Sequence, residues 1–155
     1  MKKKKNITVP SLNQEERIDF WAILVANSFK RAHSKQLKKS KSKLTFDMYL
    51  LLNALWQQDG QTRKKLALFL RKTPGSISSV AERLKKKNLI EIDKTGKKRR
   101  YYLLPEGKKV QTKISRSSIR TMENALSNIS KEERELCLGV LKRMFLNMEI
   151  EELKN

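Results

Sequence analysis

The sequence predicts a mainly α-helical fold that contains one small β-hairpin. Apolar residues recur at intervals of three and four over most of the 155 residues, which is the spacing of one helix face. Alternation with a period of two is confined to 89–104. A hydrophobic fraction of 38% is lean for a domain of this length. We therefore expect part of the burial to come from a partner chain.

Six helices are predicted, and a basic segment precedes the first. Residues 1–10 show no periodicity and are predicted to be a disordered basic arm. A helix over 11–33 begins at a capping box that starts with Ser11, and its apolar residues cover more than one face. Such a helix needs more than one packing surface. Residues 34–43 are polar and basic, and we expect them to form a linker.

Residues 44–104 predict three further helices and the hairpin. Thr45, Thr62 and Thr73 are suited to cap helices over 46–58, 63–71 and 74–87. In the helix over 63–71, the residues that we expect to point inward are Leu66, Ala67, Phe69 and Leu70. In the helix over 74–87, one apolar stripe is formed by Ile77, Val80, Ala81 and Leu84.

The other face of the helix over 74–87 has small hydrogen-bonding residues at its start and cations at its end. Small residues allow a helix to approach base edges closely, and serine and arginine can bond to bases or phosphates. The hairpin over 89–104 turns at Thr95 and Gly96. At or near its tip lie five cations, Lys94, Lys97, Lys98, Arg99 and Arg100.

Residues 105–150 predict two more helices. The first follows Pro105, and a second capping box, from Ser130 to Glu133, opens the last helix. Cys137 lies on the apolar stripe of that helix, so we expect it to be a buried small hydrophobe rather than a redox sensor.

The net charge of +20 is unevenly distributed along the chain. Residues 61–100 contain 14 basic and 3 acidic residues, and residues 1–43 contain 12 and 3. Residues 101–155 are nearly balanced, with 10 and 8. Clustered cations indicate an anionic partner such as nucleic acid. The balanced last third suits the association of two copies.

Composition also excludes several classes of protein. One cysteine and one histidine cannot supply the usual ligands of a zinc site, and a single cysteine fits a reducing cytosol. We expect no metal, no cofactor and no enzymatic activity, because no nucleophile–base pair or phosphate loop is present. No apolar run approaches the ~20 residues of a membrane helix, and no secretion signal is recognised. The expected location is the bacterial or archaeal cytosol, at the nucleoid.

A three-helix core, a recognition-type helix and a basic hairpin describe a winged helix-turn-helix, whose recognition helix enters the major groove. Four segments resemble the multiple-antibiotic-resistance regulator (MarR) family: Leu44–Tyr49, Asp59–Ala67, Ser76–Ile90 and Leu103–Gly107. The resemblance covers about 12–150. It implies a homodimer in which 44–104 bind a pseudo-palindromic operator and the helices over 11–33 and 105–150 form the dimer interface.

The residue pattern and the resemblance together predict a set of DNA-contacting residues, namely Thr62, Thr73, Gly75, Ser76, Ser78, Ser79, Arg83, Lys86, Lys97, Lys98 and Arg99. The wing departs from the family pattern. Where the family has an acidic residue, a variable residue and an arginine that enters the minor groove, this chain has Thr95, Gly96 and Lys97. Asn88 replaces a usual glycine, and asparagine tolerates a left-handed conformation.

The family also implies a pocket for a small-molecule effector. Trp21, Tyr49, Trp56 and Met144 are candidates by apolar character, and ordinary core packing is the alternative. His33 is expected at the surface, among cations. The predicted function is that of a sequence-specific double-stranded DNA-binding transcriptional regulator, most simply a homodimeric repressor released by an effector. The alternatives are a non-specific or architectural winged-helix protein and an adaptor that binds a protein partner.

Overall fold

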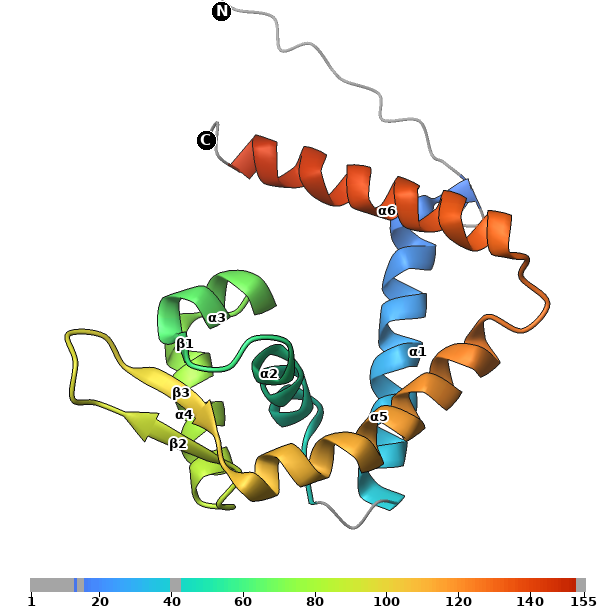
Figure 1. Cartoon of the computed structure of the whole chain (residues 1–155). Helices are drawn as coiled ribbons and strands as arrows, with labels where there is room; N and C mark the ends of the chain where they lie inside the picture. The colour runs from blue at the N-terminus through green and yellow to red at the C-terminus, as the bar shows by residue number, and fades with distance from the viewer. Residues whose placement is uncertain (1–12, 14–15, 40–42, 153–155) are drawn as a thin grey trace, which may run out of the picture. The chain divides into compact units, whose positions relative to one another are not determined.

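A computed structural model describes residue 13 and residues 16–39 and 43–152. The fold is mainly α-helical with one small antiparallel sheet, as predicted (Figure 1). The chain forms two compact units, one ending at Ser117 and the other beginning at Ser118. Within the described ranges, no helix combines the length and the apolarity that crossing a membrane requires.

Helix α1 spans Ile18–Lys39 and so extends six residues beyond the predicted end at residue 33. The helix was expected to begin near Ser11, which lies outside the described residues. The expected linker is helical as far as Lys39, and Leu37 within it is 4% exposed. Phe29, His33 and Leu37 are four residues apart and so share one face. The cations between them obscured this periodicity in the sequence.

The next three helices begin where the threonine caps predict. They are α2 (Phe46–Gln57), α3 (Arg63–Leu70) and α4 (Pro74–Lys85). All four residues of the predicted apolar stripe of α4 are buried. Phe69 was expected to point inward, and this was wrong, because it is 57% exposed. At roughly 100° per residue, Phe69 lies off the α3 face that Leu66, Ala67 and Leu70 turn to the core.

The sheet has three strands in the order β1-β3-β2, all antiparallel. The strands are β1 (Gln61–Thr62), β2 (Ile90–Asp93) and β3 (Arg100–Leu103). The sequence predicted only β2 and β3, because two residues are too short to show a period of two. Asn88, just before β2, has a φ of 56° and confirms the left-handed position.

The core lies where α2, α3, α4 and the sheet meet. Its largest fully buried side chains are Tyr101, Leu51, Leu52, Leu55, Leu66, Leu84 and Ile90. Helix α2 packs against α1 and also against α3, α4 and β3, and in Figure 1 it lies between α1 and the β2–β3 hairpin. This packing holds α4 and the hairpin on one side of α2.

Helices α5 (Pro105–Ala125) and α6 (Lys131–Glu152) complete the chain. The second capping box is confirmed, because the Ser130 N–H donates to Glu133 Oε2 at 2.7 Å and the Glu133 N–H donates to Ser130 Oγ at 3.2 Å. Arg134 donates to the carbonyl oxygens of Leu126 and Ile129 and so holds the turn between the two helices. Cys137 is exposed in this single chain, contrary to the expected burial.

Candidate nucleic-acid interface

The solvent face of α4 presents the predicted small and basic residues. Gly75, Ser79 and Arg83 are exposed, and Ser76 and Ser78 are half-buried. Lys86, directly after the helix, is also exposed. This face can approach a groove closely because the opposite stripe anchors the helix in the core.

Hydroxyl groups near the helix starts have defined roles. Thr73 Oγ1 accepts the Ser76 N–H at 3.2 Å, and Thr62 Oγ1 accepts the Lys65 N–H at 3.4 Å. Because both threonines accept in these caps, their own O–H groups stay available to donate to a phosphate. Ser78 Oγ donates to the Pro74 carbonyl oxygen at 3.1 Å, which leaves its oxygen as an acceptor.

The wing is the β2–β3 hairpin, and residues 94–100 at its tip are all exposed. Asp93 Oδ1 accepts from the Thr95 hydroxyl at 2.6 Å and from the Thr95 N–H at 2.8 Å. These hydrogen bonds hold the pKa of Asp93 below its ordinary value. They form a turn that leads to the exposed Lys97, Lys98 and Arg99.

Two residues that the sequence reasoning missed fix the base of the wing. Asp59 Oδ1 accepts the N–H of Gly60 at 3.0 Å and the N–H of Leu103 at 2.9 Å. Arg100, counted among the tip cations, donates to the Gly60 carbonyl oxygen at 2.9 Å. Gly60 has a φ of 68°, and a Cβ there would lie 2.7 Å from the Tyr102 ring. In the sequence, Asp59 and Gly60 indicated only the end of a helix.

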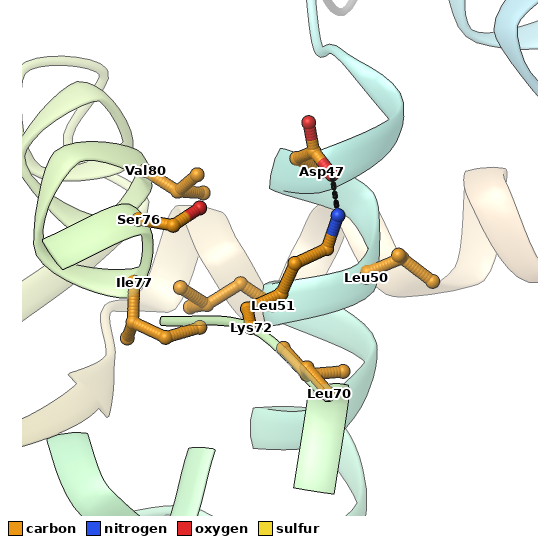
Figure 2. A pocket seen from close by; sticks show the side chains of 8 residues that line it. All are labelled: Asp47, Leu50, Leu51, Leu70, Lys72, Ser76, Ile77 and Val80. Carbon is orange, nitrogen blue, oxygen red and sulfur yellow. Dashed lines mark ion pairs between the residues drawn. The ribbon is translucent and has the colours of Figure 1, made fainter. Parts of the chain in front are cut away.

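A small cavity lies between α2 and α4, beside the predicted DNA-contacting residue Ser76 (Figure 2). Lys72 Nζ lies 3.4 Å from Asp47 Oδ1, and this ion pair ties the turn before α4 to the start of α2. The cavity holds about 10 Å³ of water-accessible space, which is about one water molecule. It is too small for an organic effector.

The four predicted effector-pocket residues have different surroundings. Tyr49 and Trp56 pack edge to face on the core, with ring centroids 6.4 Å apart, and Trp56 Nε1 donates to the Gly107 carbonyl oxygen at 3.0 Å. Trp21 on α1 is 51% exposed. Met144 belongs to α6, in the second unit. An effector pocket formed by these residues stays a prediction.

His33 is not the surface residue that the sequence suggested. Its ring stacks on Tyr49, with centroids 5.3 Å apart and planes 19° apart, and it also lies beside Phe46. Desolvation lowers the pKa of His33 below its ordinary value. Among the described residues, no cluster of three or more histidine, cysteine, aspartate or glutamate side chains is placed to hold a metal ion.

Helix α4, which buries one apolar stripe, follows the short capped helix α3 and precedes the cationic β2–β3 hairpin. This order of elements is that of a winged helix-turn-helix. Comparison with known proteins refines this class at the level of fold. No protein-family model and no curated protein sequence matches the chain. The similarity is to solved structures.

MepR from S. aureus, solved as a DNA complex, superposes with a TM-score of 0.76 at 21% identity, over 88% of this chain and 99% of that chain. A MarR-family regulator from Silicibacter pomeroyi gives 0.71 at 20% identity, over 88% and 95%. CouR from Rhodococcus jostii RHA1, bound to p-coumaroyl-CoA, gives 0.78 at 16% identity, over 86% and 95%. The chain therefore has the fold of the MarR-family winged-helix regulators, as the sequence motifs predicted.

Proposed function

We propose that this chain is a sequence-specific double-stranded DNA-binding transcriptional regulator that acts as a homodimer on a pseudo-palindromic operator. The observation that carries this proposal is the exposed face of α4. Gly75, Ser79 and Arg83 are open to solvent while the opposite stripe is buried, and the cationic wing is joined to the same core. A face of this kind offers both base and phosphate contacts.

Exposed apolar side chains support the dimer. Ile18, Ile23 and Val25 on α1 are at least 50% exposed. On α6, the exposed large apolar residues are Leu136, Leu138, Leu141, Phe145, Leu146 and Met148. Residues 118–155 contain 6 basic and 7 acidic residues, so two copies can meet there without strong repulsion. We expect light scattering to give a dimer, and a monomer would contradict this part of the proposal.

The simplest mode of action is repression by occupying a promoter, with release by a small-molecule effector. CouR, which has the same fold, is bound to p-coumaroyl-CoA. In a dimer, two recognition helices about 34–36 Å apart would read inverted half-sites one DNA turn apart. Selection from a random duplex library should therefore recover an inverted repeat, and footprinting should show two protected half-sites. Reporter expression from such a site should fall when the protein is present.

A second candidate function is non-specific or architectural DNA binding. The observation in its favour is the wing, where Lys97 stands at the place of the family's minor-groove arginine and where five of the seven residues 94–100 are cationic and all are exposed. Arginine suits a narrow minor groove better than lysine does, because it is less strongly hydrated.

Affinity for the selected repeat and for a scrambled duplex, each at two salt concentrations, separates the two candidates. A ratio of affinities of about 10³ or more supports the regulator. A ratio near one, with a steep fall of log affinity with log salt, supports the architectural protein.

A further inference from the structure

A row of cations on α1 lies apart from the surface formed by α4 and the wing. Lys30, Arg31, Ser34, Lys35 and Lys38 line one shallow groove, largely open to solvent, along the C-terminal half of α1. At roughly 100° per residue, positions spaced by one, four, five and eight share one side of a helix. Helix α2 lies between α1 and the wing (Figure 1).

The opposite side of α1 packs against α2 and the core, so the side with the groove faces solvent. The His33 ring stacks on Tyr49 of α2, and Leu37 is 4% exposed in the core. A helix held on one side cannot rotate about its axis without exposing that apolar contact. The groove therefore faces solvent as a preformed surface.

The cations of the groove are not neutralised within the described part of the chain. None of the ion pairs found there involves Lys30, Arg31, Lys35 or Lys38. The acidic residue of α1, Asp19, is paired with Arg17 at the other end of the helix. Like charges four residues apart, such as Arg31 and Lys35, repel each other, and a bound anion would relieve this repulsion.

We propose that this groove binds a ligand that carries at least two closely spaced phosphates. Arginine presents a planar fork that suits phosphate oxygens, and lysines supply point charges. The Arg31 guanidinium is already oriented, because its Nη2 donates to Ser28 Oγ at 2.9 Å, while the Ser34 hydroxyl adds a neutral donor. Four cations over about two helical turns exceed what one carboxylate could neutralise. The phosphates belong either to the DNA backbone or to a free polyphosphorylated molecule.

Inorganic tripolyphosphate is the probe for the groove itself, since its binding is measured without DNA and does not depend on the proposed function. We expect the full chain to bind it in calorimetry more tightly than inorganic monophosphate at equal ionic strength. Lys35→Gln with Lys38→Gln should weaken binding about tenfold. The matched control, Lys131→Gln with Lys142→Gln on α6, removes the same charge and should change binding less than twofold. Equal losses in the two variants, or no loss in either, would overturn the proposal.

Lysine footprinting with an amine-reactive label gives a second readout and identifies the source of the phosphates. Tripolyphosphate should protect Lys35 and Lys38 but not Lys131. Protection of Lys35 and Lys38 by a long duplex as well assigns the groove to DNA backbone. Protection of Lys97 alone by the duplex assigns it to a free molecule. If neither probe protects Lys35 or Lys38, the groove is not a phosphate site, whatever the outcome for operator binding.

Discussion

Gly107, in the first turn of α5, is the position where the structure makes its sharpest prediction about stability. A Cβ at this residue would lie 2.0 Å from the Leu89 carbonyl oxygen and 3.0 Å from its carbonyl carbon. That oxygen also accepts the Leu104 N–H at 3.0 Å. The Gly107 carbonyl accepts from Trp56 at 3.0 Å. Both backbone segments are thus held in place, and Gly107→Ala should force them apart by about 1 Å or more.

The magnitude follows from two opposing terms. Replacing glycine by alanine inside a helix contributes about 1 kcal/mol of stability through helix propensity. Overpacking costs typically about 1–3 kcal/mol and occasionally more, and we take the upper part of this range because Gly107 would press on backbone rather than on a flexible side chain. The expected net effect is a loss of about 2 kcal/mol, which corresponds to roughly 4–8 °C in the melting temperature.

Urea unfolding followed by circular dichroism measures this effect, at one fixed protein concentration because self-association would shift the midpoint. Gly75→Ala in α4 is the matched control, since its Cβ would lie 4.0 Å from Thr73 Oγ1 and meet nothing closer. We expect the control to be as stable as the wild type or up to about 1 kcal/mol more stable, because the gain in helix propensity is not offset by overpacking there. A Gly107→Ala variant as stable as the wild type would refute the close approach of α5 to Leu89.

Three further predictions concern the cap of α4, the DNA contacts and pH. Thr73→Ala removes the acceptor of the Ser76 N–H and should lower the free energy of unfolding in urea by about 1 kcal/mol. Thr73→Ser keeps a hydroxyl acceptor and should retain most of that stability. Arg83→Ala should cost about 1–3 kcal/mol on the selected repeat and little on scrambled DNA, while Lys97→Ala should weaken both alike and lower the salt slope by about one; fluorescence anisotropy distinguishes the two patterns. His33 has a folded-state pKa below its ordinary value of 6.5, so the unfolded chain binds the proton more readily and stability should fall as the pH drops below about 6.5. In His33→Phe this part of the pH dependence should disappear.

Local signals account for what the sequence could predict. Three helices begin at the threonines chosen as caps, and the box at Ser130 is reciprocal as expected. Each of these bonds joins residues three apart, so the sequence contains both partners within one short window. The stripe of α4 was predictable for the same reason, because its period is that of a single helix.

Long-range contacts account for what the sequence could not predict. Asp59 accepts a hydrogen bond from a residue 44 positions away, and Trp56 donates to one 51 positions away. Strand β1 exists because β3 offers it a partner, with Gln61 opposite Tyr101. Leu37 extends α1 because the core buries it. The spacing of residues along the chain does not predict any of these contacts, because the partners are far apart in the sequence.

The apolar side chains of α1 and α6 mark the boundary between these two kinds of information. Periodicity predicted apolar faces on both helices, but Trp21 on α1 and Leu141 on α6 remain exposed in the single chain, at 51% and 48%. A helical pattern predicts which residues share a face. It does not predict which other surface packs against that face, because this depends on shape and charge in three dimensions. The first unit holds 30 basic and 9 acidic residues, and the second holds 6 and 7. Two copies that meet through the second unit would therefore bring nearly balanced charge together, and the cations of the first unit would not be needed for that contact.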